Sequence, residues 1–355
     1  MKTFKEAYKN YFKVGAAVSA HWLDEAAETL KTHFDTVTCE NEMKYNLIHP
    51  HDYPKPDFRH MRPPKPGEKR EPPPPPEITR RERFVHPSME TDFSPADKIY
   101  NFALENGLGV RGHALMWHGN YPWGIFEQLT PEEIRVNTEE HFKMVSEHFP
   151  ECFCWDVVNE AVDDHGGYLR ETVFKNKLGE DYLYEIYALA RKYFPNQELV
   201  CNDYNEYVPQ KRESILRLVN GLKERGLVDV IGCQCHINAL MKQEQLDNIK
   251  CSLEMYAETG LKLHITEMDV NCIDWKNPDA LPPEHLSERV AEVYGEVFGI
   301  FRGMKDVIES VTLWGVSDKH SWLSSFKNRE GRKNLPLLFN EKYKPKEALL
   351  RVIDF

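Results

Sequence analysis

The sequence predicts an α/β fold, a (β/α)8 TIM barrel that forms a single domain over residues 1–355. Three observations predict it: short apolar segments recur along the chain, helical periodicity lies between most of them, and polar residues end nearly all of them. Strands that alternate with helices pair in parallel through right-handed crossovers. Eight such units close naturally into a barrel, and 355 residues suffice for one with insertions.

The eight apolar segments are the predicted strands, and helical stretches connect them. In chain order the segments are 14–19, 37–40, 108–117, 153–160, 198–204, 229–237, 261–270 and 310–316. The connecting stretches with helical periodicity include 131–149, 182–194 and 211–226. Seven of the eight segments carry polar or aromatic residues at or just after their ends. Because the chemistry of such a barrel lies at the carboxyl ends of its strands, these residues are the site candidates.

Residues 51–90 interrupt the pattern after the second predicted strand. They hold 11 of the 23 prolines, including the run Pro72–Pro76, together with mixed charges. This composition predicts neither a helix nor a sheet strand, and polyproline II is its expected local form. We expect an inserted loop that emerges on the same face as the strand ends. It is either a solvated loop or a lid, wall or oligomer contact at one end of the cleft.

The composition disfavours several classes of partner. A net charge of −12 makes nucleic acid and anionic membranes unsuitable main partners. No segment approaches the roughly 20 apolar residues of a membrane helix. The N-terminal stretch MKTFKEAYKNYFKVGAAV lacks the apolar core of a signal peptide. We therefore expect a cytoplasmic protein, although a secreted chain whose leader had been removed would look the same.

Two Cys-x-Cys pairs, Cys152/Cys154 and Cys233/Cys235, raise the question of a zinc site. Both pairs lie in apolar segments, where cysteine commonly serves as a small hydrophobic residue, so we predict buried thiols. The sequence shows neither the ligand spacing of a catalytic metal site nor a glycine-rich phosphate loop. We expect no metal ion and no other cofactor.

Glu160 and Glu267 are the glutamates that end apolar segments late in the predicted barrel. A carboxylate at the mouth of a buried strand is costly unless something uses it. Two carboxylates across a cleft are the minimum apparatus for cleaving a glycosidic bond, because one protonates the leaving oxygen while the other attacks the anomeric carbon or activates water. A structural set of ion pairs is the alternative, but neither glutamate has a basic neighbour in sequence.

The neighbouring residues support a sugar-cleaving site. Glu267 and Asp269 share one face of an extended strand, and His236 ends the adjacent predicted strand, so we expect these three side chains to cluster. Aromatic rings suit stacking on sugar rings, and polar groups suit hydrogen bonds to hydroxyls. The aromatic candidates are Trp117, Trp314, Trp322 and Tyr204. The polar candidates are Glu40, Asn41, Lys44, Asn120 and Gln234.

The chain resembles glycoside hydrolase family 10, the endo-β-1,4-xylanases, over nearly its whole length. The motifs that carry the resemblance, in the family's order, are TCENEMK, RGHALMWH, WDVVNEAV, NDYN, GCQCHI, ITEMDV and WGVSDKHSW. The resemblance implies a retaining mechanism through a covalent glycosyl-enzyme, with Glu160 as acid/base and Glu267 as nucleophile. It also implies that Asn159 bonds the sugar 2-hydroxyl.

The resemblance assigns further residues to sugar subsites. The reacting sugar would be surrounded by Lys44, His113, Trp117, Gln234, His236, Trp314 and Trp322. The next sugar toward the non-reducing end would meet Glu40 and Asn41. The first leaving-group subsite would hold Tyr204 and Asn205. Three features depart from the family's pattern: Asn120 stands in place of Gln, His320 in place of Tyr, and the segment 51–87 is longer than usual.

The expected substrate is xylan or its oligosaccharides, and the resemblance is to intracellular members that trim imported xylo-oligosaccharides. Two alternatives stay open. One is a related barrel glycosidase that prefers gluco-oligosaccharides, and the other is a carbohydrate-binding barrel without catalysis. The oligomeric state stays open as well.

Overall fold

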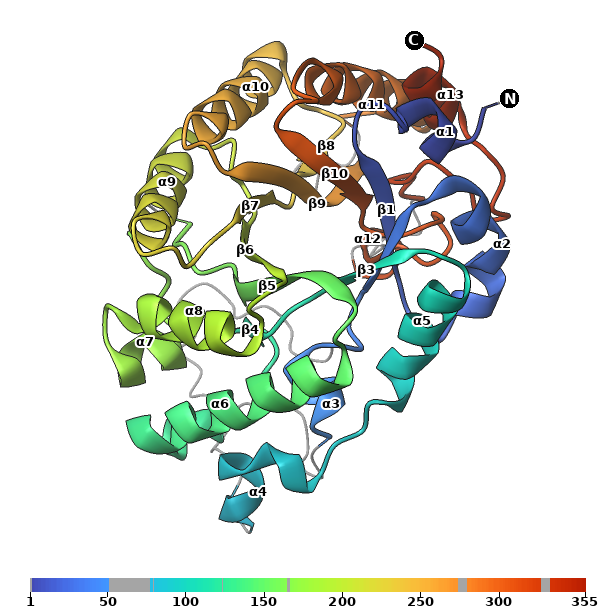
Figure 1. The fold of residues 1–355 in the computed structure, drawn as a ribbon. Helices are drawn as coiled ribbons and strands as arrows, with labels where there is room; N and C mark the ends of the chain where they lie inside the picture. The colour runs from blue at the N-terminus through green and yellow to red at the C-terminus, as the bar shows by residue number, and fades with distance from the viewer. Residues whose placement is uncertain are drawn as a thin grey trace, which may run out of the picture.

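Within the described part of the chain, eight parallel strands close into a barrel, which confirms the predicted fold class (Figure 1). The structure is a computed structural model that describes residues 2–50, 77–78, 80–122, 124–164, 167–273, 280–326 and 333–355. The barrel strands are β1 (Lys13–Val18), β2 (Thr36–Cys39), β3 (Gly109–Gly112), β5 (Cys152–Asn159), β6 (Glu198–Asp203), β7 (Val230–Cys233), β9 (Lys262–Asn271) and β10 (Ile308–Leu313). The pairing of β10 with both β1 and β9 closes the ring.

Two of the predicted strands are interrupted, which the sequence did not indicate. The segment 108–117 divides into β3 and β4 (Met116–Trp117), and 229–237 divides into β7 and β8 (His236–Asn238). The first break follows His113, whose peptide bond to Ala114 is cis. At the second, Cys235 has a left-handed φ of 57°. Both short strands still pair in parallel with a neighbour, β4 with β5 and β8 with β9, so they extend the rim of the barrel.

Helices surround the barrel, and the three predicted from periodicity are confirmed (Figure 1). They are α6 (Pro131–His148), α8 (Tyr182–Tyr193) and α9 (Pro209–Lys223). The start of α6 is encoded locally, because Thr130 and Glu133 form a capping box and Pro131 is the first helical residue. The other α-helices are α1 (Phe4–Tyr8), α2 (Leu23–His33), α3 (Tyr45–Ile48), α4 (Arg81–Val85), α5 (Ser94–Glu105), α7 (Val173–Leu178), α10 (Gln243–Ala257), α11 (Leu286–Gly303), α12 (Trp322–Phe326) and α13 (Glu347–Ile353). Among the described helices, none combines the length and the apolar character needed to cross a bilayer.

The prediction that 51–90 contains no helix is wrong at its C-terminal end. The proline-free stretch Arg81–Val85 forms α4, and a 3-10 turn follows at Pro87–Met89. Tertiary contacts with α6 stabilise this short helix: Phe84 is buried, its carbonyl accepts a hydrogen bond from Asn137, and Arg81 pairs with Glu133. Residues 51–76 and 79, which hold most of the predicted proline-rich loop, lie outside the described residues.

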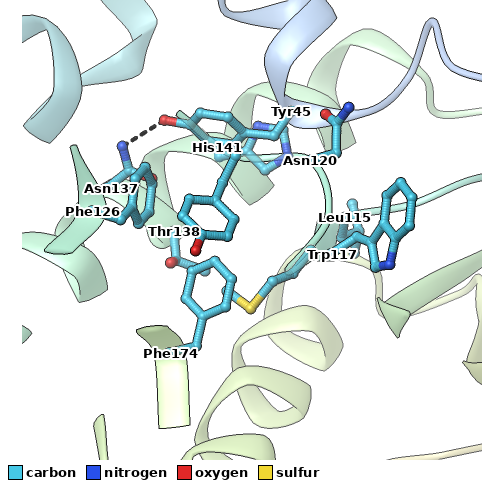
Figure 2. A pocket seen from close by; sticks show the side chains of 11 residues that line it. Tyr45, Leu115, Trp117, Asn120, Phe126, Asn137, Thr138, His141 and Phe174 are labelled. Atoms are coloured by element: carbon cyan, nitrogen blue, oxygen red, sulfur yellow. Dashed lines mark hydrogen bonds between the residues drawn. The ribbon is translucent and has the colours of Figure 1, made fainter. Parts of the chain in front are cut away.

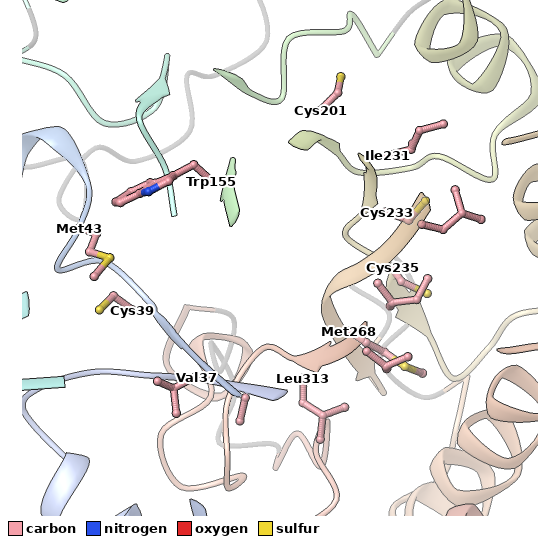
Figure 3. Close-up of a cluster of buried hydrophobic side chains, with 14 of the residues drawn as sticks. Val37, Cys39, Met43, Trp155, Cys201, Ile231, Cys233, Cys235, Met268 and Leu313 are labelled. Carbon is pink, nitrogen blue, oxygen red and sulfur yellow. The ribbon is translucent and has the colours of Figure 1, made fainter. Parts of the chain in front are cut away.

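The core is formed by strand side chains that interlock with the helices, and the predicted thiols belong to it. Figure 3 shows Cys233 and Cys235 among apolar neighbours that include Ile231 and Met268. Cys152 and Cys154 are buried as well, and burial raises the pKa of all four thiols. These cysteines therefore act as small hydrophobic residues, as predicted.

A glycine at the end of β3 permits the close packing of one large aromatic side chain. Trp155 of β5 is fully buried. A Cβ atom on Gly112 would lie 2.2 Å from the Trp155 ring, so only a residue without a side chain fits there. This contact fixes β3 against β5 just below His113.

Candidate active site

The structure places Glu160 and Glu267 at the same rim, on two different strands. Glu160 directly follows β5 and has a left-handed φ of 59°, while its amide N–H donates to the carbonyl of Asn202 at 2.9 Å. Glu267 lies within β9 and is only 4% exposed. Its amide N–H donates to the carbonyl of Gln234 at 3.1 Å. The two carboxylates therefore have different surroundings, one half-buried and one buried.

Two asparagine side chains connect the carboxylates. The Asn202 amide donates to Glu267 Oε1 at 2.8 Å and to Asn159 Oδ1 at 2.9 Å. Asn159 in turn donates from Nδ2 to Glu160 Oε1 at 3.3 Å. The predicted residue Asn159 is therefore joined to both acids. Asn202 was not among the predicted site residues, although it lies in the NDYN motif at the end of β6.

Glu160 is held by three donors that converge from different strands. Trp117 Nε1 donates to Glu160 Oε2 at 2.9 Å. Gln234 Nε2 donates to Glu160 Oε1 at 3.2 Å, and Asn159 Nδ2 donates to the same oxygen. These bonds fix the direction in which the carboxyl group points, so its rotamer is set before any ligand binds.

The predicted cluster around Glu267 is brought together. His236 Nε2 lies 3.4 Å from Glu267 Oε2, and His236 Nδ1 lies 2.9 Å from Asp269 Oδ1. Asp269 Oδ2 accepts a hydrogen bond from Trp322 Nε1 at 2.8 Å. The parallel pairing of β8 with β9 sets His236 directly opposite Asp269, which explains why these side chains meet.

The electrostatics of this cluster favour an ionised Glu267. Burial by itself raises the pKa of Glu267, but the hydrogen bond from His236 and the electrostatic effects of His113 and His236 outweigh it and lower the pKa to about 2. Burial likewise lowers the pKa of His236, yet Asp269 and Glu267 more than offset this and raise it to about 10. Across neutral pH the group is a carboxylate beside an imidazolium.

We expect the substitution His236→Asn to shift the acid limb of the pH profile to higher pH by roughly 1–3 pH units. The profile is that of kcat/KM for the expected xylo-oligosaccharide substrate. The pKa of Glu267 is lowered in the parent chain, so its ionised form is present above that pKa and is lost as the pH falls through it. Without the imidazolium, burial dominates and the pKa of Glu267 rises. The matched control is His148→Asn, since His148 pairs with Asp97 on the surface. An unmoved acid limb in His236→Asn would contradict the role of this ion pair.

Lys44 and its neighbours form a second group on the β2 side. Lys44 is 6% exposed and donates from Nζ to Asn41 Oδ1 at 3.1 Å. Its Nζ lies 4.7 Å from the ring centre of Trp117 and 5.8 Å from that of Trp314. Burial raises the pKa of nearby Glu40 to about 7, although Lys44 opposes this. Near neutrality, Glu40 can therefore donate as well as accept a hydrogen bond.

His113 is oriented from inside the barrel. Its Nδ1 lies 2.8 Å from Asp156 Oδ2, and Asp156 also pairs with Arg111. The His113 ring meets the Trp314 ring edge-on, with 5.1 Å between their centres. Asp156 and Arg111 were not among the predicted site residues, although they lie in the motifs WDVVNEAV and RGHALMWH.

A small apolar pocket is lined in part by Trp117 and Asn120 (Figure 2). Aromatic side chains form much of its lining, among them Tyr45. The Tyr45 hydroxyl accepts a hydrogen bond from Asn137 Nδ2 at 2.7 Å, which ties α3 to α6. Since Lys44 is the N-cap residue of α3, this contact also fixes the backbone that carries Lys44.

Two of the residues that depart from the family pattern make local contacts. Asn120 Oδ1 accepts the backbone N–H of Asn46 at 2.9 Å. His320 stacks on Trp22 with 5.1 Å between ring centres, and its Nε2 lies 3.3 Å from Glu25 Oε2. His320 therefore belongs to a polar contact between the β10 side of the rim and α2.

Tyr204 and Asn205 directly follow β6. The Tyr204 hydroxyl bonds to Asp164 and accepts from Arg170 at 3.0 Å, while Lys211 Nζ lies 3.7 Å from the centre of its ring. Asn205 has a left-handed φ of 53°, and its carbonyl accepts the N–H of Val208 at 2.9 Å. Asp164, Arg170 and Lys211 were not among the predicted site residues.

Comparison with known proteins agrees with this geometry. Residues 3–355 match the family model of glycosyl hydrolase family 10. The chain is 36% identical over 362 residues to endo-1,4-beta-xylanase A of Caldicellulosiruptor saccharolyticus, which covers 99% of this chain and 95% of the relative.

Two solved structures have the same fold. A mutant structure in complex with xylotriose has a TM-score of 0.83 and 35% identity, with 100% of both chains covered. A mutant of TsXylA, the intracellular xylanase from Thermoanaerobacterium saccharolyticum, in complex with xylotetraose has a TM-score of 0.79 and 28% identity, with 99% of this chain and 98% of that chain covered. The chain therefore belongs to glycosyl hydrolase family 10.

Proposed function

We propose that the chain is a retaining endo-1,4-β-xylanase, with Glu160 as acid/base and Glu267 as nucleophile. The observation that carries this proposal is the pair of carboxylates, one directly after β5 and one within β9, that are joined through Asn159 and Asn202. One of them is kept ionised by its neighbours, as a nucleophile must be. The other is half-buried and held in place by neutral donors, as suits a group that gives and takes a proton.

The first step forms a covalent glycosyl-enzyme. A carboxylate oxygen of Glu267 attacks the anomeric carbon as the bond from that carbon to the leaving oxygen breaks. Glu160 transfers its proton to that oxygen, so the leaving sugar departs as a neutral alcohol and Glu160 becomes ionised.

The second step reverses these roles. Glu160, now a carboxylate, removes a proton from water as the water oxygen attacks the anomeric carbon. The ester to Glu267 breaks, Glu267 returns to its ionised form, and the sugar is released with its original anomeric configuration. His236 stabilises the Glu267 carboxylate as it leaves and is itself held by Asp269.

The remaining site residues bind and orient the sugars. We propose that Asn159, which is bonded to Glu160 and Asn202, bonds the 2-hydroxyl of the reacting sugar. Around that sugar lie Lys44, His113, Trp117, Gln234, Trp314 and Trp322. Glu40, Asn41 and Asn120 serve the sugars on the non-reducing side, while Tyr204 and Asn205 serve the leaving-group side.

The decisive test compares two activated substrates. We expect kcat/KM for an aryl β-xylobioside to exceed that for the matching aryl β-cellobioside by at least about tenfold, because a C5 hydroxymethyl group has to fit among the aromatic rings. A product time course on xylan and on xylotriose through xylohexaose then shows whether internal bonds are cleaved. Faster cleavage of the cellobioside would favour a gluco-oligosaccharide enzyme. Tight sugar binding without turnover would favour a non-catalytic carbohydrate-binding protein.

We propose an intracellular site of action on short xylo-oligosaccharides. The likeness to the intracellular xylanase of Thermoanaerobacterium saccharolyticum supports it. Fractionation of cells that produce the protein natively tests it: we expect the xylanase to follow a cytosolic marker. Recovery in the culture medium without that marker would contradict this location.

A further inference from the structure

Arg170 reaches back to the backbone of Glu160 from the loop that follows β5. Its Nε donates to the Glu160 carbonyl at 3.0 Å, and its Nη2 donates to the Val162 carbonyl at 3.1 Å. Its own backbone N–H donates to the carbonyl of Ala161 at 2.9 Å, and Val162 forms an antiparallel bridge with Leu169. The guanidinium and the backbone N–H of Arg170 together therefore bond the carbonyls of residues 160–162, the first three residues after β5.

The same guanidinium reaches the leaving-group side. Its Nη2 lies 3.0 Å from both the Tyr204 hydroxyl and Asp164 Oδ2. Asp164 also pairs with the buried Lys211, at 2.5 Å between Nζ and Oδ1. Arg170 thus contacts the backbone of one proposed functional residue and the side chain of another.

A second contact chain leads back to the same loop. Lys211 Nζ lies 2.9 Å from Asp203 Oδ1, and Asp203 Oδ2 accepts the N–H of Val162 at 2.9 Å. Asp203 is buried at the end of β6. The loop after Glu160 is therefore tied to β6 through the Val162 N–H and to Arg170 through its carbonyls.

Glu160 depends on such support because of its backbone conformation. A non-glycine residue in the left-handed region is disfavoured and persists only where its surroundings hold it. Its φ and ψ set the direction of the side chain, which must stay within reach of Trp117 and Gln234. A displacement of about 1 Å in a reacting group can cost about 100-fold in rate.

We propose that Arg170 is a positioning residue for the acid/base step. It couples the orientation of the Glu160 side chain to Tyr204, which lies in the proposed leaving-group subsite. This inference rests on the proposed function, since it concerns the proton that Glu160 gives to the leaving oxygen. Arg170 touches neither carboxylate oxygen in the structure and acts through the Glu160 carbonyl.

Substrates with different leaving groups test the proposal, because kcat/KM reports the first, bond-breaking step. Xylotriose needs its leaving oxygen protonated, whereas 2,4-dinitrophenyl β-xylobioside releases a stable phenolate without that proton. We expect Arg170→Ala to lower kcat/KM for xylotriose by roughly 10- to 100-fold, a part of the 10²–10⁴ that acid–base catalysis supplies. The dinitrophenyl substrate should lose no more than about threefold.

Three further variants complete the test. Arg217→Ala is the matched control, since Arg217 is exposed and stacks on Tyr168 at 3.8 Å, and it should leave both rates unchanged. Arg170→Lys keeps a charge but loses the planar fork, so it should recover part of the xylotriose rate. Tyr204→Phe keeps the ring and removes the hydroxyl. We expect it to give a smaller loss of the same kind, and the double variant to lose less than the product of the two single losses.

The outcomes separate this inference from the proposed function. A parent chain that cleaves neither substrate contradicts the proposed function. A parent that cleaves both, with equal losses on the two substrates in Arg170→Ala, shows a merely structural role and overturns the inference, as does an unchanged xylotriose rate. If Arg170→Ala does not fold, as judged by its thermal melting, the leaving-group pattern of Arg170→Lys and Tyr204→Phe decides in the same way.

Discussion

Replacing Glu267 with glycine is expected to lower kcat for xylotriose on the order of 10⁵-fold or more, to the limit of detection. The residue supplies the atom that bonds to the anomeric carbon, so nothing nearby can substitute for it. Asn202 and His236, which contact its two oxygens, are donors rather than nucleophiles. Glu309→Gly serves as the matched control. Glu309 lies in β10 and pairs with Lys262, near the amino-terminal ends of the strands.

A trapping experiment identifies the nucleophile directly. A 2-deoxy-2-fluoro xylobioside with a good leaving group forms the glycosyl-enzyme but hydrolyses it slowly, so the adduct accumulates. Peptide mapping by mass spectrometry should place the label on Glu267 in the parent chain and find none in Glu267→Gly. A label on another residue, or retained xylotriose turnover in the variant, would assign the attack to a different group.

The barrel and its two acids were predictable because both signals are local. Each strand is a short apolar run, and the order of strands and helices is read directly along the chain. A carboxylate at the end of such a run needs no tertiary information to stand out, and the family motifs supported the same two positions. The two strand breaks could not be predicted from the sequence, because the apolar pattern continues through both of them. At the second break, between β7 and β8, the Cys235 N–H makes a long-range hydrogen bond to Glu206 Oε1 at 3.0 Å.

The parts of the site that the sequence did not reveal are those that act through long-range hydrogen bonds. Asn202 lies 43 residues from Asn159 and 65 from Glu267, and it joins them only once β6 lies beside β5. Arg170 reads in sequence as a surface residue in a polar loop. Helix α4 is short and follows many prolines, so its formation depends on burial of Phe84 against α6 and not on local propensity.

The roles of the two acids can be told apart by adding azide to Glu160→Ala. Loss of the acid should lower kcat/KM for xylotriose by about 10²–10⁴-fold. With 2,4-dinitrophenyl β-xylobioside the first step still runs, because the leaving phenolate needs no proton. The glycosyl-enzyme then accumulates, since no base activates water. Azide is already an anion and needs no base, so it should raise the turnover and yield a glycosyl azide.

The configuration of that azide fixes which face each carboxylate serves. In Glu160→Ala, azide attacks a glycosyl-enzyme that Glu267 has already formed, so two inversions give the β-glycosyl azide. In Glu267→Gly, azide enters the space that the nucleophile vacated and displaces the phenolate once, so one inversion gives the α-glycosyl azide. Proton NMR of the two products distinguishes the anomers. The opposite pair of products would exchange the two roles, and a failure of azide to accelerate Glu160→Ala would show that Glu160 is not the base. Because each variant is the control for the other, a general loss of folding cannot produce this pattern.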